Sequence, residues 1–358
     1  MRSAIDSATV ETSRTVAGRR CFRDHRTGRP RKPVIFDLIK LGGSVLTDKG
    51  TPYRLRDDVL SRLAREVADG IAEERWQSGA GLVIVHGAGS FGHPRAAASS
   101  IPVLGRTAPT PTLQNPPSPS ISPVPQSPPA TQSSSTPLPS LRQTVVHVQA
   151  EVRRLHLALL EALVHAGVPA VSLPGAGFLR MQNGRLERPD LTEFLRATSQ
   201  GLVPVTCGDV ILDASRGPHV VSGDRVMTEI CRQSEPERVT FVTDVDGVYD
   251  RNPADPEARL LSQLCLSVSD EHPAEKRPAE ERLAIERPAE TPHRGDLTSA
   301  EGRSEWVDVT GGMEGKLDEI RSIVDGKRST FIVSGLHPGR LEARLRGAPV
   351  VGTAITTN

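Results

Sequence analysis

The sequence predicts an α/β fold, a three-layer αβα sandwich in which helices cover both faces of a mainly parallel central sheet. Short apolar runs alternate along the chain with longer amphipathic segments, the pattern that produces such sheets. The apolar runs lack the polar alternation of a half-exposed strand, so both faces of each strand are expected to be buried. Each run ends at Gly, Asp, Ser or Pro, and ligand-binding loops lie at such strand ends.

The elements follow in chain order. The predicted strands are Val34–Lys40, Gly81–Val85, Val168–Leu173, Val203–Thr206, Val239–Thr243 and Thr330–Val333. The predicted helices between them are Leu55–Gln77, Leu141–His165, Asp224–Gln233 and Met313–Asp325. The second helix has the clearest pattern, because its apolar residues recur every three or four positions and form one face: Val145, Val148, Val152, Leu155 and Leu159.

Three segments depart from this pattern. Residues 1–33 are rich in arginine and lack an apolar stretch, and we interpret them as a disordered leader or the product of an over-extended start codon, with an organelle transit peptide as the alternative. Residues 101–140 are rich in proline and serine and predict a flexible loop. Residues 270–304 are dense in charge, repeat the letters RPAE and predict a solvated insertion with a short helix near 279–286. The interrupted domain is therefore 34–358.

Composition excludes several classes of protein. The chain has 358 residues, with 44 Lys+Arg against 43 Asp+Glu, and this net charge of +1 argues against nucleic acid as a partner. No run of 18 apolar residues exists, so no membrane partner is expected. Four cysteines are widely spaced and suggest neither a disulfide framework nor a zinc site, so we expect reduced thiols in a cytoplasmic protein.

Glycine-rich loops follow the first two strands. Lys40 and the sequence Gly42-Gly43-Ser44 come first, with Lys49 nine residues after Lys40, and such glycines let backbone N–H groups approach an anion. No Walker A motif is present, and a tight turn explains this first loop about equally well. The second loop runs from His86 to His93 through three glycines. A metal held by its two histidines is disfavoured because no Cys, Asp or Glu lies between residues 82 and 99. His86 closes a buried strand and is therefore interpreted as a structural hydrogen-bonder.

Three further loops combine glycine with acidic or basic residues. The Gly208-Asp209 pair and Asp224 follow apolar runs, and Asp224 could cap the next helix. Asp209 could order a turn, position the lysines or position a hydrated magnesium ion. The segment from Asp244 to Asp250 lacks the spacing of an EF-hand. The last loop opens a helix with two glycines and carries Lys316 one turn later. Together the five loops favour a polyanionic ligand such as a nucleoside triphosphate, and phosphoryl transfer requires mainly positioning and charge neutralisation.

These motifs resemble the amino acid kinase superfamily, and within it the isopentenyl phosphate kinases. The matching segments occur in the family's order: IKLGGSVLTDK (39–49), VIVHGAGSFGHP (83–94), AGVPAVSLP (166–174), PVTCGDVILD (204–213), SGDRV (222–226), FVTDVDGVYD (241–250) and DVTGGMEGK (308–316). The SFGH ending of the second loop is the most specific part, and the related fosfomycin kinases share it. Residues 99–140 depart from the family pattern, so the chain length of the acceptor is not readable from the sequence.

The resemblance implies a role for each matching residue. The ATP-binding residues would be Lys40, Gly42, Gly43, Ser44, Gly89, Asp244, Gly312 and Lys316. The acceptor phosphate would be bound by Ala88, His93 and Gly208. The catalytic residues would be Lys40, Lys49, His93 and Asp209, with Lys49 neutralising the transferring phosphoryl group and Asp209 organising the lysines.

The resemblance also implies the reaction. A phosphate monoester, isopentenyl phosphate, would attack the γ-phosphorus of ATP, with Mg²⁺ held mainly by phosphates and water. The nucleophile is already ionised at neutral pH, so no general base is required. The partners would be a small-molecule phosphate and a second copy in a homodimer. The alternatives are a fosfomycin, phosphonate or carboxylate kinase of the same fold, or a non-catalytic nucleotide-binding protein.

Overall fold

The chain divides into two units, Met1–Pro33 and Val34–Asn358, each described here by itself. The computed structural model describes residues 35–71, 81–92, 101–104, 141–251, 253, 255–266, 317, 319–324 and 328–357. It also gives the backbone of short strands at 22–23, 30–31 and 285–286. In the first unit, β1 (Phe22–Arg23) and β2 (Pro30–Arg31) pair antiparallel, while the rest of the predicted leader lies outside the described residues.

The second unit is built around a nine-stranded sheet with the order β13-β12-β15-β14-β11-β3-β4-β8-β5. Its strands are β3 (Ile35–Leu41), β4 (Gly81–His86), β5 (Ala170–Ser172), β8 (Val203–Cys207), β11 (Arg238–Thr243), β12 (Gln263–Leu266), β13 (Ile285–Glu286), β14 (Ser329–Ser334) and β15 (Gly352–Thr357). Only β14–β15 and β12–β13 pair antiparallel among these described strands. All six predicted strands are present, which confirms the mainly parallel sheet.

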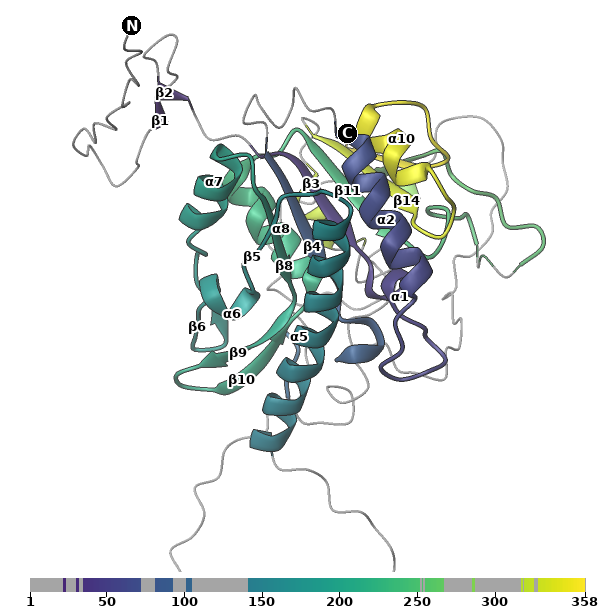
Figure 1. The fold of residues 1–358 in the computed structure, drawn as a ribbon. Helices are drawn as coiled ribbons and strands as arrows, with labels where there is room; N and C mark the ends of the chain where they lie inside the picture. The colour runs from purple at the N-terminus through teal and green to yellow at the C-terminus, as the bar shows by residue number, and fades with distance from the viewer. Residues whose placement is uncertain are drawn as a thin grey trace, which may run out of the picture. The chain divides into compact units, whose positions relative to one another are not determined.

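Helices pack on both faces of this sheet, as the sequence predicts (Figure 1). One face is covered by α2 (Asp57–Gly70), α5 (Leu141–His165) and α10 (Arg340–Arg346). The other is covered by α7 (Thr192–Ser199) and α8 (Gly223–Ser234). The face of α5 named from the sequence is the packed one, because Val148, Val152, Leu155 and Leu159 are buried. No helix among the described residues is long and apolar enough to cross a membrane.

A smaller sheet lies beside the carboxyl end of the main one. Its order is β10-β9-β6-β7, formed by β6 (Met181–Gln182), β7 (Arg185–Leu186), β9 (Asp209–Asp213) and β10 (Gly217–Val221). The sequence does not predict this sheet. A third, small apolar cluster lies between α5 and the β9–β10 hairpin, and Ala88 of the second glycine loop packs against it. The hairpin is therefore placed next to that loop.

Several boundaries differ from the sequence predictions. The helix predicted over Leu55–Gln77 begins at Asp57 and ends at Gly70. Residues 101–104, assigned from sequence to the flexible loop, instead pair with β10, where the Leu104 amide donates to Val220 at 2.9 Å. Within the charged insertion, residues 285–286 form strand β13 rather than a helix, because they pair with β12. Residues 105–140 and most of 270–304 lie outside the described residues.

Candidate active site at the carboxyl ends of the strands

The first glycine loop joins β3 to a short helix, α1 (Gly43–Leu46), rather than forming a simple turn. The Gly42 amide donates to the Val242 carbonyl of β11 at 2.8 Å, which fixes the loop to the neighbouring strand. The hydroxyl of Thr47 donates to the Gly43 carbonyl at 2.8 Å and closes the helix. The amides of Gly43 and Ser44 have no hydrogen-bond partner among the described residues, so these donors are available for an anion.

The second glycine loop packs directly on the first. The Gly87 amide donates to the Leu41 carbonyl at 2.9 Å, and the Ser90 amide donates to Thr47 Oγ1 at 3.0 Å. A Cβ added at Gly43 would lie 2.1 Å from the Gly89 nitrogen. Gly89 also has φ +53°, the left-handed region that glycine adopts without penalty. The two backbones can meet only because both positions lack a side chain.

The meeting of the two loops is the centre of the site. The amides of Ala88 and Gly89 have no partner among the described residues, like those of Gly43 and Ser44. Backbone N–H donors from the loops after β3 and β4 therefore lie together where the two loops meet. Such a set of fixed dipoles can bind two phosphate groups without the cost of reorganising side chains.

Lys40 lies at the end of β3 and pairs with Asp224 of α8. Its Nζ is 2.6 Å from Asp224 Oδ1, and both side chains are largely buried. The sequence allowed Asp224 to cap α8, and this is wrong: the cap is Ser222, whose Oγ accepts from the Arg225 amide at 3.1 Å. Asp224 is free of that role because the hydroxyl fills it. The carboxylate instead holds Lys40 beside the glycine loops.

Lys49 pairs with Asp244 at the end of β11. Its Nζ is 2.6 Å from Asp244 Oδ2, while the other carboxylate oxygen accepts from Ser44 Oγ at 2.8 Å. Burial would raise the pKa of Asp244, but the hydrogen bond and charge of Lys49 and the hydrogen bond of Ser44 hold the pKa below its ordinary value. An ionised Asp244 thus ties the Lys49 loop to α1. Lys49 itself is half exposed, so its ammonium group can reach a ligand.

Asp209 does not contact either lysine. Its buried carboxylate pairs with Arg153 of α5 and accepts from the Ala176 amide at 3.1 Å and the Val210 amide at 2.9 Å. The structure therefore differs from the expectation that Asp209 organises the lysines. Asp224 and Asp244 pair with the lysines instead. The preceding residue, Gly208, lies close to the backbone of Gly223, because a Cβ added at Gly208 would lie 2.7 Å from the Gly223 nitrogen. Gly208 thus joins the hairpin to the start of α8.

His86 is a structural hydrogen-bonder, as predicted from its place at the end of a strand. Its ring is fully buried, with Nδ1 at 3.0 Å from the Gly87 carbonyl and Nε2 at 2.9 Å from His156 Nδ1. Burial first, and the charge of neighbouring groups second, lower the pKa of His86 to about 3 and that of His156 to about 4. Both rings are neutral at pH 7. Sequence reasoning missed His156, which lies 70 residues from its partner.

These rings and Cys207 form the one group of potential metal ligands found among the described residues, with ligand atoms within 4.8 Å of one another. The facing ring nitrogens are already hydrogen-bonded to each other. Arg153 Nη1 donates to the sulfur at 3.8 Å, and burial raises the pKa of the Cys207 thiol to about 12. A cation here would meet a guanidinium and a protonated thiol, so we assign the group a structural role.

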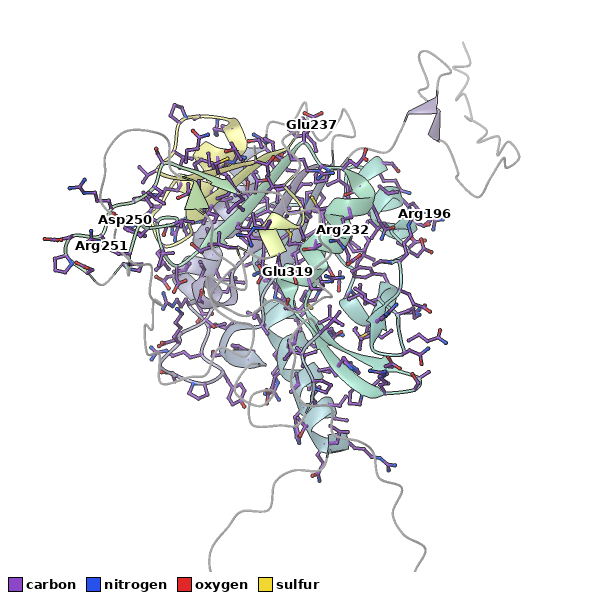
Figure 2. The ribbon with its side chains drawn as sticks, turned by 180° about the vertical axis from the view of Figure 1, so that it is seen from behind. Arg196, Arg232, Glu237, Asp250, Arg251 and Glu319 are labelled. Atoms are coloured by element: carbon purple, nitrogen blue, oxygen red, sulfur yellow. The ribbon has the colours of Figure 1, made fainter. Side chains whose placement is uncertain are left out.

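Polar contacts also fix the loop after β11 and join Glu319 to α8. Asp246 accepts from Arg340 at 2.6 Å and lies 3.2 Å from His337, which joins the loop after β11 to the start of α10. Glu319, which is labelled in Figure 2, accepts from Thr228 of α8 at 2.8 Å. Burial raises the pKa of Glu319 above its ordinary value. The helix expected over Met313–Asp325 is present in part, at 317 and 319–321.

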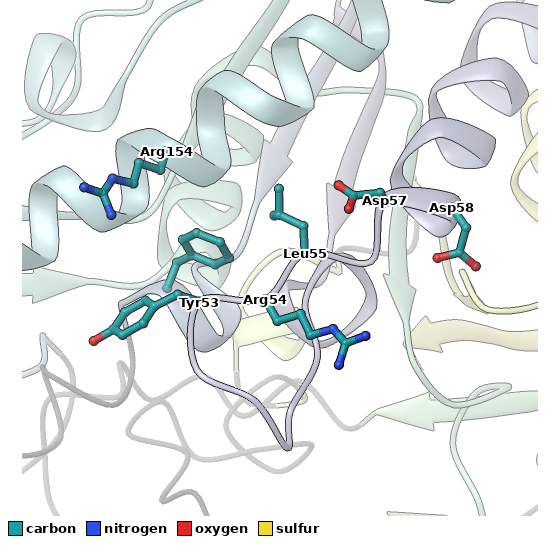
Figure 3. Close-up of a pocket in the computed structure, with 7 residues that line it drawn as sticks. Tyr53, Arg54, Leu55, Asp57, Asp58 and Arg154 are labelled. Atoms are coloured by element: carbon teal, nitrogen blue, oxygen red, sulfur yellow. The ribbon is translucent and has the colours of Figure 1, made fainter.

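An open hollow of about 590 Å³ adjoins the second loop on the side of α5 (Figure 3). Its lining residues are Tyr53, Arg54, Leu55, Asp57, Asp58, Phe91 and Arg154. Tyr53 contacts Phe91 edge to face, with ring centroids 6.1 Å apart, and Thr47 pairs with Leu55. These contacts anchor the loop that carries Lys49 to the second glycine loop.

Of the site residues expected from the sequence, ten lie in the described part of the chain. The structure brings together Lys40, Gly42, Gly43, Ser44, Lys49, Ala88, Gly89 and Asp244 around the two loops, with Gly208 and Asp209 at the adjoining hairpin. His93, Gly312 and Lys316 lie outside the described residues. Their roles stay predictions.

Comparisons with known proteins agree with this arrangement. The profile described as "Amino acid kinase family" matches residues 38–334. Isopentenyl phosphate kinase from Methanothermobacter thermautotrophicus is 32% identical over 323 residues, covering 89% of this chain and 98% of that protein. The enzyme of the same name from Thermoplasma acidophilum is 25% identical, covering 85% and 94%.

A solved structure gives the same result for the fold. An X-ray structure of isopentenyl phosphate kinase superposes with a TM-score of 0.61 at 29% identity and covers 89% of this chain and 100% of that one. The family profile spans both glycine loops, both lysines and the acidic residues that hold them. The chain belongs to the amino acid kinase family.

Proposed function

We propose that this protein transfers the γ-phosphoryl group of ATP to isopentenyl phosphate, giving isopentenyl diphosphate and ADP. The proposal rests above all on one observation: the backbones of the two glycine loops touch, and Lys40 and Lys49 lie beside that contact. Relatives that share most of the chain's length bear the name isopentenyl phosphate kinase. ATP use follows from the family. The phosphate acceptor is the finer part of the proposal.

The glycine loops divide the two substrates between them. The amides of Gly43 and Ser44 would hold the ATP phosphates, with Gly312 and Lys316 completing the nucleotide side. The Ala88 amide would hold the acceptor phosphate, with His93 and Gly208 beside it, while the neighbouring Gly89 amide would reach the ATP phosphates. Because the loops touch, the two phosphates are brought within reach of each other. Positioning of this kind supplies much of the rate in phosphoryl transfer.

The chain's cations would stabilise the charge that develops. In the reaction, an acceptor-phosphate oxygen forms a bond to the γ-phosphorus while the bond to the ADP oxygen breaks. Lys40 would bridge the ATP phosphates, and Lys49 would follow the transferring group from its half-exposed loop. The acceptor is already ionised at neutral pH, so no side chain must remove a proton. His93 would orient the acceptor by a hydrogen bond.

Magnesium would be held mainly by phosphates and water. The described carboxylates of the site fit this, because Asp209, Asp224 and Asp244 are each paired with an arginine or a lysine. Paired carboxylates leave few protein oxygens for a dedicated cage, the usual situation for Mg²⁺ beside phosphates. When bound, the ion would neutralise phosphate charge.

The protein would act as a homodimer joined through α5. Val146, Leu157 and Val164 share one exposed face of this helix, and Leu157 is 54% exposed. Arg154 and Glu161 flank Leu157 at similar distances in sequence. If two copies of α5 pack antiparallel about Leu157, each Arg154 faces the other copy's Glu161, which is the self-complementarity a two-fold interface requires. The wide spacing of the four cysteines in the sequence argues against a disulfide framework, and on that basis the proposed setting is cytoplasmic.

A coupled ADP-release assay tests the proposed reaction. We expect turnover with isopentenyl phosphate that exceeds turnover with dimethylallyl phosphate, fosfomycin, glutamate and aspartate. Preference for fosfomycin or a carboxylate would replace the proposal with another kinase of the family. ATP binding without turnover of any acceptor would indicate a non-catalytic protein.

Two substitutions test the assigned roles within that assay. Lys49→Ala and His93→Ala should keep the fold and lose most activity, roughly a hundredfold or more in kcat, because each removes charge stabilisation or orientation from the transfer. Circular dichroism checks the fold. Wild-type turnover by either variant would remove that residue from the mechanism.

A further inference from the structure

A chain of buried hydrogen bonds runs beneath the second glycine loop and has no part in the reaction described above. It passes from the Gly87 carbonyl to His86, from His86 to His156 of α5, and from His156 Nε2 to Ser172 Oγ of β5 at 2.7 Å. The His86 ring is fully buried and the His156 ring nearly so. The charged and titratable groups that face these rings are Arg153, Cys207 and Asp209.

The direction of this chain follows from the carbonyl at its end. The Gly87 carbonyl can only accept, so His86 Nδ1 must carry the proton. In a neutral ring Nε2 then accepts, which requires His156 to carry its proton on Nδ1. His156 Nε2 accepts in turn, and the Ser172 hydroxyl donates. Each member thus has one allowed orientation, and the proton of every ring lies on Nδ1.

The fixed carbonyl determines where the next amide points. In a trans peptide, the C=O of one residue and the N–H of the next lie in one plane and point in opposite directions. The chain has no cis peptide bond, so the N–H of Ala88 points directly away from the His86 ring. The loop is also held on either side, because the Gly87 amide donates to Leu41 and the Phe91 amide donates to Ala88.

We propose that His86, His156 and Ser172 are positioning residues that aim the Ala88 amide at the acceptor phosphate. The inference rests on the proposed function, since Ala88 is the acceptor-side donor there. A ring that holds the carbonyl prevents rotation of the Gly87–Ala88 peptide, the motion that would turn the donor away. If apolar side chains of similar volume replaced His86 and His156, they would fill the same space but would not fix the Gly87–Ala88 peptide.

The ring protons give a test that does not depend on catalysis. Long-range ¹H–¹⁵N spectra of the full chain report which nitrogen of a histidine is protonated, and the signals are assigned by comparing His86→Asn and His156→Asn samples. We expect both rings to be neutral with the proton on Nδ1. A proton on Nε2 of His86 would overturn the proposal, because that ring could not hold the Gly87 carbonyl.

Two substitutions at His156 separate positioning from packing. The amide nitrogen of asparagine lies the same number of bonds from the backbone as Nδ1, so His156→Asn keeps a donor to His86. His156→Leu fills the space but removes that donor. We expect His156→Leu to raise the KM for isopentenyl phosphate roughly three- to tenfold, the usual effect of one neutral hydrogen bond, with the KM for ATP unchanged. His156→Asn should stay near wild type.

The outcomes distinguish this proposal from the proposed function. If His156→Leu matches wild type in acceptor KM, or shifts both KM values equally, or if His156→Asn behaves like His156→Leu, the positioning role is wrong. If wild-type protein does not turn over isopentenyl phosphate, the proposed acceptor is wrong, while the ring spectra still report the direction of the chain. If His156→Leu does not fold, the wild-type ring spectra and the His156→Asn kinetics decide.

Discussion

Both lysines of the described part of the site are held by an acid from a distant part of the chain. Lys40 meets Asp224, which is 184 residues away, and Lys49 meets Asp244. An ammonium group held in this way is already in place before a ligand arrives, so little side-chain entropy is lost on binding. The two lysines differ in exposure, and this difference suits their proposed roles as a buried anchor and a half-exposed partner of the transferring group.

Asp224→Asn should lower kcat by roughly ten- to a hundredfold while the protein still folds, because Lys40 keeps a neutral acceptor but loses the charge that fixes it. The steady-state assay with ATP and isopentenyl phosphate measures this. Asp250→Asn is the matched control, since that carboxylate lies at the loop after β11 and contacts Arg251 instead. Equal kcat in the two variants would show that Asp224 does not position Lys40.

Single residues of the site were predictable where a local motif marks them. Lys40, Ser44 and Asp244 follow strands in glycine-rich segments, and the structure places them together. Pairings across the fold were not predictable. Nothing local in the sequence links Asp224 to Lys40 rather than to the cap of α8, and Arg153 sits mid-helix without any motif. Such contacts depend on how α5 and α8 pack, which single-sequence patterns do not contain.

At the scale of elements, the contact of the two glycine loops sets the geometry. Gly43→Ala should destabilise the protein by about 1–3 kcal/mol and abolish most activity, because the new Cβ would lie 2.1 Å from the Gly89 nitrogen and the backbones must separate. Gly177→Ala is the control, since no atom lies within 4 Å of a Cβ at that position. Urea unfolding and kcat give the two readouts. Normal activity in Gly43→Ala would mean that the loops need not touch.

The buried histidine pair between β4 and α5 makes stability depend on pH. The folded pKa of His86 is about 3 and that of His156 about 4, against 6.5 for an ordinary histidine. As the pH falls below 6.5, the unfolded chain binds protons that the folded rings exclude, so the free energy of unfolding decreases. At pH 5 the loss is roughly 2 kcal/mol for each ring.

Urea unfolding at pH 7.5 and pH 5.0 measures this loss, and His156→Asn should lose roughly half as much because one buried ring is gone. An identical pH dependence in the two proteins would contradict the prediction.

The regular elements were largely visible in the sequence, because the six predicted strands and the long α5 carry strong apolar patterns. Five of these strands are largely buried as expected, whereas β5 is only half-buried because it lies at the edge of the sheet. The hairpin of β9 and β10 was not, since its strands are short and Gly217-Pro218 and Gly208 interrupt the pattern. Its stability comes from packing on α5 through Val210, a long-range contact. The strand β13 was likewise read as helical because its charged surroundings hide a two-residue pairing.

At the scale of the whole molecule, the exposed face of α5 is the site where a second copy would bind. If the proposed homodimer forms, Leu157→Arg should convert it to a monomer, because the new charge would be buried against the same charge of the second copy. Light scattering coupled to size exclusion measures the mass. Leu212→Arg is the control, since Leu212 is 67% exposed but lies on β9. A dimer that survives Leu157→Arg would require a different interface.

The backbone-to-backbone contact of Gly43 with Gly89 also restricts how this enzyme can evolve. A Cβ at Gly43 would lie 2.1 Å from the Gly89 nitrogen, and a Cβ at Gly89 would lie 2.5 Å from the Gly43 carbonyl oxygen as well as 2.2 Å from Thr47 Oγ1. Exchanging Thr47 would remove only the last of these clashes, because the others involve main-chain atoms. No second substitution can therefore compensate the first, and the pair cannot drift together as packed core residues do. In a library that randomises both loops, functional variants should keep glycine at both positions independently, and new acceptor specificity should arise from the surrounding walls.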